Sequence, residues 1–162
     1  MNTTDQRLQK LEAIAAKRQR DFVLVLENIH DPHNAAAICR SADGFGIQEI
    51  WLICETVPKW DLFDLGKNSS AFTSRWITFR HFETTEACLL ELKDQNYQLW
   101  STMLDEQAES LVEANFTQTE KIALIMGNEH RGISEVVQKA TDKTTFFPLK
   151  ESPFISSYKL KL

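Results

Sequence analysis

The residues of this chain that could carry chemistry lie in two short segments, 27–40 and 127–132. In the first segment, Arg40 follows a run of small and apolar residues that is predicted to be helical. Burying an arginine on such a helix is costly unless its guanidinium meets an anion. That anion is either a bound ligand or Asp43, three residues further along, and the sequence leaves both interpretations open.

The second segment places Gly127 and Gly132 on either side of Asn-Glu-His-Arg. Glycine lets the backbone approach a ligand closely and adopt torsion angles that other residues avoid. The alternative is an ordinary strand-to-helix turn in which Glu129 and Arg131 form a structural ion pair. The spacing of the residues does not decide between the two.

Two histidines, His30 and His33, flank Asp31 and invite a metal interpretation. No third ligand has matching spacing, so we expect no metal here. We expect Asp31-Pro32 to set a turn and Asn34 to cap the helix that follows.

The elements that must position these segments alternate between strand and helix. Continuous apolar runs at 22–27, 49–54 and 121–126 are typical of strands buried on both faces of a parallel sheet. A helix is predicted from about 34 to 45, ending near Gly46. Weaker patterns predict helices at 5–18, 83–94 and 134–141, strands at 76–79, 97–101 and 144–147, a strand or turn near 110–112, and a loop with a helical piece at 55–75.

This alternation indicates an open, mostly parallel α/β sheet, in which ligands bind beyond the carboxyl ends of the strands. Three segments follow predicted strands and are therefore expected at that edge: 27–34, 127–132 and the stretch after Pro148. The glycine-rich dinucleotide fingerprint and the phosphate-binding P-loop are missing from the sequence, which argues against a dehydrogenase or a nucleotide hydrolase.

The composition is that of an ordinary cytoplasmic protein. The chain has 162 residues, 43% of them hydrophobic and 25% charged, and three cysteines without paired spacing, which we expect to be reduced thiols. No apolar run has the length of a membrane span, and the polar N-terminus does not resemble a signal peptide. The net charge of -5 argues weakly against nucleic-acid binding, but phosphate contacts depend on local clusters of basic residues.

The residues 27–46 resemble motif 1 of the SpoU/TrmH family of RNA 2′-O-ribose methyltransferases, and 123–134 resemble motif 2. The match runs from about residue 7 to residue 149, and the lead-in from Arg7 to Asp21 resembles the TrmH branch, which methylates tRNA guanosine. The resemblance implies a SPOUT-type α/β fold: a parallel sheet flanked by helices, with a C-terminal trefoil-knot region. It also implies a cytoplasmic homodimer, S-adenosylmethionine as methyl donor, no metal, and tRNA or rRNA as substrate.

The resemblance also assigns roles to individual residues. The implied catalytic group is Asn34, Arg40 and Glu129. The implied cofactor contacts are Thr102, Gly127, Phe147, Leu149 and Tyr158. Apart from the resemblance, clusters of basic residues make Arg18, Arg20, Arg40, Arg75 and Arg131 the candidate RNA contacts; the alternative is that these clusters are ordinary solvated surface.

The chain departs from the family after Pro148-Leu149, where motif 3 should follow. Glu151 stands where the family has a glycine; alternatively, a two-residue insertion aligns Ser157-Tyr158 with the expected serine and hydrophobic residue. We therefore expect a helical extension at 1–20, a methyltransferase domain at 21–149, and an aberrant tail at 150–162 with an incomplete knot. The alternative function is a catalytically impaired relative that binds RNA or a partner without methylating.

Overall fold

The computed structural model describes residues 3–16, 18–59, 77–103, 105, 107–116 and 119–148. These residues form a seven-stranded sheet in the order β3-β2-β1-β6-β4-β7-β5, and every pairing between its strands is parallel. The strands are β1 (Gln19–Glu27), β2 (Ile47–Ile53), β3 (Thr78–Phe82), β4 (Gln98–Thr102), β5 (Glu109–Ser110), β6 (Ile122–Met126) and β7 (Lys143–Phe146). This confirms the predicted parallel α/β sheet.

The centre of the sheet is built from the apolar runs that predicted its strands. β1 lies between β2 and β6, and Val25 is in register with Trp51 on one side and Ile125 on the other. All three of these side chains are fully buried. Strands buried on both faces cannot alternate apolar with polar residues, which explains why the runs are continuous.

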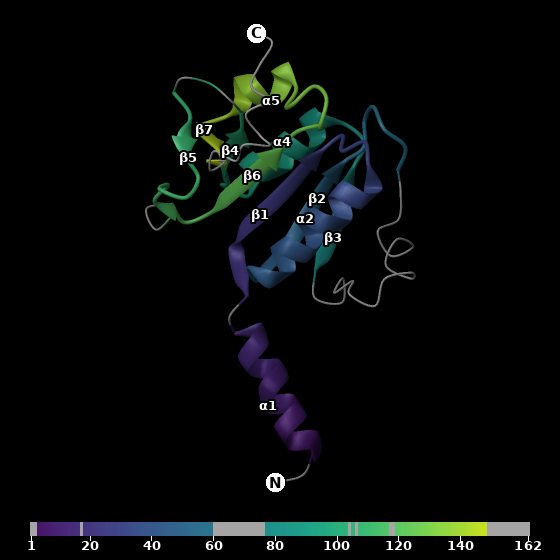
Figure 1. Ribbon diagram of the computed structural model, residues 1–162, viewed down its shortest axis with the longest axis vertical. Helices are drawn as coiled ribbons and strands as arrows, with labels where there is room; N and C mark the ends of the chain where they lie inside the picture. The colour runs from purple at the N-terminus through teal and green to yellow at the C-terminus, as the bar shows by residue number, and fades with distance from the viewer. Residues whose placement is uncertain are drawn as a thin grey trace, which may run out of the picture.

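Helices cover both faces of this sheet (Figure 1). α2 (Pro32–Gly44) packs on one face, and α4 (Thr85–Asp94) and α5 (Glu135–Ala140) pack on the other. α1 (Thr3–Ala15) projects away from the sheet below the start of β1. No helix within the described ranges is long and apolar enough to cross a bilayer.

The start of α2 differs from the prediction. The helix begins at Pro32, and Asp31, not Asn34, is its N-cap, because the Asp31 carboxylate accepts a hydrogen bond of 2.8 Å from the backbone N–H of His33. Proline fits the first helical position, where its missing N–H would have no partner. The prediction that Asn34 caps the helix is therefore wrong, and its side chain is free for another partner. The far end agrees with the prediction, since Gly46 has the left-handed φ of 78° that ends many helices.

The other boundaries shift by a few residues. The strand expected at 76–79 is β3, which begins at Thr78 and continues to Phe82 because it pairs residue by residue with β2. The helical piece expected within 55–75 falls mostly outside the described residues; 55–59 form an irregular loop.

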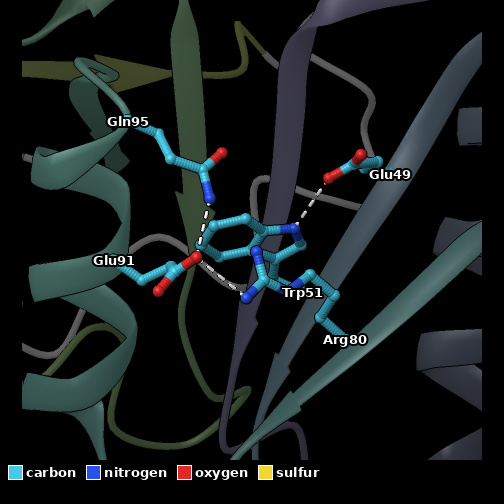
Figure 2. A network of polar contacts seen from close by, with 5 residues as sticks. All are labelled: Glu49, Trp51, Arg80, Glu91 and Gln95. Carbon is cyan, nitrogen blue, oxygen red and sulfur yellow. Dashed lines mark hydrogen bonds and ion pairs between the residues drawn. The ribbon is translucent and has the colours of Figure 1, made fainter.

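A polar network joins α4 to the sheet (Figure 2). The Arg80 guanidinium lies 4.4 Å from the centre of the Trp51 ring and donates a hydrogen bond of 2.9 Å to Glu91. Gln95 donates to the same Glu91 oxygen at 2.7 Å, while the Trp51 indole N–H donates to Glu49 at 3.0 Å. In this network the cation is matched by an anion and an aromatic face, so its role is structural.

Candidate active site

The two chemistry-bearing segments meet at the carboxyl edge of the sheet. β1 ends at Glu27 and β6 ends at Met126, and the two strands are neighbours in the sheet. The chain leaves β1 toward β2 on one side, while β6 connects to the other half of the sheet. A strand order that diverges in this way opens a crevice where ligands bind in α/β proteins.

The turn after β6 is tightly closed. Asn128 and Gly132 form an antiparallel bridge, with N–H to carbonyl distances of 2.9 and 2.8 Å. A side chain at Gly127 would collide with the backbone of Gly132 and Ile133. Gly127 is therefore required by the turn itself, and Gly132, with a φ of 68°, by its backbone conformation.

This turn presents Glu129 to the segment after β1. One oxygen of Glu129 accepts from the backbone N–H of His30 at 3.0 Å, and the other from that of Asp31 at 3.3 Å. The second oxygen also accepts from the Asn34 side-chain amide at 2.9 Å, across 95 positions of sequence. The structure thus brings together Asn34 and Glu129, two of the three expected catalytic residues, and the alternative ion pair between Glu129 and Arg131 is not formed.

The donors around Glu129 keep it ionised. Partial burial acts to raise the pKa of Glu129, whereas hydrogen bonds from the Asn34 side chain and from the backbone N–H groups of His30 and Asp31 lower it, and the result is a pKa of about 2. All of these donors are uncharged. Glu129 therefore stays an anion at physiological pH, with no arginine or lysine as partner in the part of the chain that the structure describes.

Arg40, the third expected catalytic residue, lies elsewhere on α2. It follows Asn34 by six positions, which places it about 9 Å along the helix axis and about 120° around it. Its side chain is exposed and makes no hydrogen bond or ion pair within the described part of the chain. Asp43, considered above as its partner, pairs instead with Arg18.

The residues expected around the cofactor follow three adjacent strands. Thr102 ends β4, Gly127 follows β6, and Phe147 follows β7. The Thr102 hydroxyl donates to the carbonyl of Ile125 at 3.4 Å, and Phe147 is 48% exposed. The remaining two expected contacts, Leu149 and Tyr158, lie outside the described residues.

The expected RNA-binding arginines do not form one patch. Arg18 forms an ion pair of 2.6 Å with Asp43, and the two side chains are only 9% and 13% exposed. Arg20 is exposed at the amino end of β1, whereas Arg131 is exposed at the opposite, carboxyl edge. Arg75 lies outside the described residues.

A cavity of about 500 Å³ lies beside the turn that carries Glu129. Its lining includes His30, Thr56, His130 and Arg131. The rings of His30 and His130 meet edge to face, with centroids 6.1 Å apart. Among the described residues, no three histidine, cysteine or carboxylate side chains are grouped as metal ligands.

Sequence reasoning missed the importance of Glu27, which is 1% exposed. It ends a run of four fully buried apolar residues in β1, and the cost of burying a carboxylate requires a specific partner. That position, a charged residue closing an apolar strand, is the signal that could have drawn attention to it.

Comparison with known proteins identifies the family of this chain. The model of the SpoU rRNA Methylase family matches residues 21–154. The tRNA (guanosine(18)-2′-O)-methyltransferase of Thermus thermophilus is 28% identical over 90% of this chain and 72% of its own length.

Two solved structures share the fold. One is the A. aeolicus TrmH/SpoU tRNA modifying enzyme, with a TM-score of 0.69 and 23% identity over 91% of this chain and 73% of that one. The other is the SpoU methyltransferase AviRb from Streptomyces viridochromogenes in complex with AdoMet, with a TM-score of 0.66 and 21% identity over 83% of this chain and 51% of that one. The sheet is thus of the SPOUT type, and the match of the family model over most of the sequence means that the chain belongs to the SpoU rRNA methylase family.

Proposed function

We propose that this protein transfers a methyl group from S-adenosylmethionine to a ribose 2′-hydroxyl of RNA, most specifically of a tRNA guanosine. The observation that carries the proposal is the hydrogen bond between Asn34 and Glu129, which joins the two family motifs at the carboxyl edge of the sheet. The activity named for the Thermus thermophilus relative supports the choice of tRNA guanosine.

The Asn34 amide has a fixed orientation in this proposal. An ionised carboxylate only accepts hydrogen bonds, so the Asn34 atom facing Glu129 must be the amide nitrogen. The amide oxygen of Asn34 is then available to accept a hydrogen bond from the 2′-hydroxyl and to orient it. Orientation of this kind is a large part of what an enzyme contributes to a transfer reaction.

Arg40 supplies the positive charge. The 2′-hydroxyl is a poor nucleophile, and negative charge develops on its oxygen as its proton passes to water or to an oxygen of a substrate phosphate. A guanidinium does not deprotonate in proteins, so Arg40 is not a base in this proposal. It grips a substrate phosphate and stabilises the developing negative charge.

The cofactor positions suit S-adenosylmethionine in their chemistry. Thr102 offers a hydroxyl, Gly127 offers backbone groups in a turn without a side chain, and Phe147 offers an exposed apolar ring, all at the ends of adjacent strands. When bound, S-adenosylmethionine supplies a sulfonium methyl group that is already a strong electrophile. The protein residues need only bind it and orient the hydroxyl; we include Leu149 and Tyr158 among the contacts by family resemblance.

We also propose that two copies pair to complete the site. Asn34 and Arg40 point to different sides of α2, which suits a site shared between subunits. An open apolar groove of about 770 Å³ runs beside α2, with Ile38, Phe45 and Leu124 in its lining, and such a surface suits a protein contact. The remaining parts of the proposal are a cytoplasmic location, a helical extension at 1–20 preceding a domain at 21–149, and an aberrant tail at 150–162 that leaves the C-terminal knot incomplete.

The test combines binding with chemistry. Calorimetric titration with S-adenosylmethionine is expected to show micromolar binding, and a tRNA transcript incubated with labelled cofactor is expected to gain one 2′-O-methylguanosine. Sedimentation is expected to give the mass of two chains. RNA binding without cofactor binding, even at millimolar concentration, would instead support the impaired relative that binds without methylating.

A further inference from the structure

Glu27 is a buried carboxylate that the proposed reaction does not use. One of its oxygens accepts a hydrogen bond of 2.8 Å from the backbone N–H of Ser134, which lies 107 positions away. The other oxygen lies 3.1 Å from the hydroxyl of Thr85. Ser134 is the N-cap of α5 and Thr85 is the first residue of α4, so this carboxylate ties β1 to the starts of two helices.

Glu27, the last residue of β1, and Asn28, which follows it, hold the two ends of the turn that carries Glu129. At the start of the turn, the Asn128 side-chain amide donates to the carbonyl of Asn28 at 2.6 Å. At its end, Ser134 donates to Glu27. Between these two anchors, Glu129 receives its hydrogen bonds from the segment after β1. The position of Glu129 therefore depends on two hydrogen bonds that Glu129 does not itself make, Asn128 to Asn28 and Ser134 to Glu27.

Of the two donors that contact Glu27, the backbone N–H of Ser134 donates to Glu27 alone, whereas the Thr85 hydroxyl is shared with a second carboxylate. The Thr85 hydroxyl has a single proton but faces two carboxylates, Glu27 at 3.1 Å and Glu55 at 2.7 Å, so it donates to only one of them at a time. Glu55 is exposed and also accepts from the backbone N–H of Thr85 at 3.0 Å. Glu55 thus shares Thr85 with Glu27 but has no bond to the turn, which makes it a natural control.

We propose that Glu27 is a positioning residue of the active site: by holding Ser134 it fixes the turn that carries Glu129 and, through Glu129, the orientation of the Asn34 amide. The expected change in kcat rests on the proposed function. The expected changes in Ser134 exchange and in the Glu129 titration do not, because they concern only residues of this chain. The experiment below therefore measures the two separately.

The experiment compares Glu27→Ala, Glu27→Gln and Glu55→Ala in the full-length protein. In Glu27→Ala, the amide of Ser134 is expected to exchange with solvent at least about tenfold faster, because it loses its acceptor. The Glu129 side chain, followed by NMR during an acid titration, is expected to titrate closer to the ordinary value of 4.5. The methylation kcat is expected to fall by about 10- to 100-fold, while the KM for S-adenosylmethionine changes less, as expected for misplacement of a catalytic group.

The variants Glu27→Gln and Glu55→Ala distinguish a loss of positioning of Glu129 from a general loss of stability. Glu27→Gln keeps an oxygen that accepts from Ser134, so it is expected to recover most of the protection and of kcat. Glu55→Ala is expected to leave Ser134 exchange, the Glu129 titration and kcat unchanged. A folded Glu27→Ala protein in which Glu129 titrates and Ser134 exchanges as in the wild type would overturn the proposal.

A second pair of variants covers the case in which Glu27→Ala does not fold. Ser134→Pro removes the N–H donor at a residue whose φ of -69° suits proline, and Ser134→Ala keeps the N–H while losing only the cap. The Glu129 titration is expected to shift in Ser134→Pro and not in Ser134→Ala; equal behaviour of the two would contradict the proposal. A wild type that transfers no methyl group would contradict the proposed function, while these titrations still decide the role of Glu27.

Discussion

Two carboxylates of this protein, Glu91 and Glu129, are both held by several donors, yet the donors differ in kind. Glu91 lies in the α4 network and accepts from the Arg80 guanidinium and from Gln95, which lower its pKa. Glu129 lies at the carboxyl edge, and its donors among the described residues are an amide side chain and backbone N–H groups. The negative charge of Glu91 is thus balanced by the positive charge of Arg80, whereas that of Glu129 is stabilised by the dipoles of uncharged N–H groups.

The difference teaches where an outside anion can bind. In the α4 network the Arg80 guanidinium pairs with Glu91 and lies over the Trp51 ring, so its charge is already matched within the protein (Figure 2). At the carboxyl edge, Glu129 is held by uncharged donors, and within the described ranges neither Arg131 in the same turn nor Arg40 further along α2 forms an ion pair. Under the proposed function, those two guanidinium groups, unpaired among the described residues, are the ones expected to bind RNA phosphates.

The largest expected effect is a loss of methyl transfer when Arg40, which is outside the α4 network, is replaced, compared with Arg80, which is inside it. Arg40→Lys is expected to lower methyl transfer to tRNA by about 10²- to 10³-fold, the usual loss when a group that stabilises transition-state charge is displaced. Its cofactor affinity and melting temperature should stay near the wild type, because Arg40 is exposed and forms no ion pair with any residue that the structure describes. Single-turnover methylation assays and calorimetry measure the two quantities.

The matched control is Arg80→Lys, which keeps the charge but loses the planar group that lies over Trp51. It is expected to lower stability by about 1 kcal/mol and to leave methyl transfer per folded molecule unchanged. Normal activity in Arg40→Lys, or an equal loss in both variants, would remove the distinction between the two regions.

The next effect concerns the arginines expected to bind RNA. Arg18→Ala is expected to lower the free energy of unfolding by about 2–3 kcal/mol, somewhat less than for a fully buried pair, because Asp43 is left without its cation. Arg20→Ala should change stability by no more than about 0.5 kcal/mol, since its side chain is exposed. Urea denaturation measures both.

RNA affinity should show the opposite order: Arg20→Ala, which hardly changes stability, is expected to weaken RNA binding, and Arg18→Ala is not. If Arg20 contacts a phosphate, Arg20→Ala weakens RNA binding and reduces the salt dependence by about one released counterion. Arg18→Ala should leave both unchanged once the protein is folded. A reduced salt slope in Arg18→Ala instead would mean that the ion pair with Asp43 opens to bind RNA.

A smaller effect is the difference in stability between alanine variants of two glycines, Gly127 and Gly44. Gly127→Ala is expected to lower stability by about 1–3 kcal/mol, because the added methyl group collides with the backbone of Gly132 and Ile133. Gly44→Ala meets open space near the end of α2 and is expected to raise stability by about 0.5–1 kcal/mol. Thermal unfolding of the two variants tests this; a neutral Gly127→Ala would show that the turn is not rigid.

These contrasts also show what the sequence could reveal. The apolar runs at 22–27 and 121–126 predicted the central strands correctly, because a strand buried on both faces leaves a continuous signature in the sequence. The strand ends then placed both motifs at one edge, where Asn34 and Glu129 indeed meet.

The polar partners were not predictable in the same way. Asp43 was considered as a partner for Arg40, three residues away, yet it pairs with Arg18 across 25 positions. Likewise, Glu27 bonds to Ser134 across 107 positions. Periodicity reports which face of an element is buried, but a pairing between distant side chains depends on the register and packing of whole elements.

The smallest expected effect is the pH dependence that Glu129 gives to stability. Its folded pKa of about 2 lies below the ordinary value of 4.5, so its contribution is fully present above about pH 4.5 and is lost as the pH falls toward 2. Because the group is exposed, we expect this contribution to be about 1 kcal/mol or less. Glu129→Gln cannot titrate, so the stability difference between wild type and variant should shrink from pH 5 to pH 2 in urea denaturation. A difference that stays constant over this range would mean that Glu129 is not held by its neutral donors, and the contrast with Glu91 would then fail.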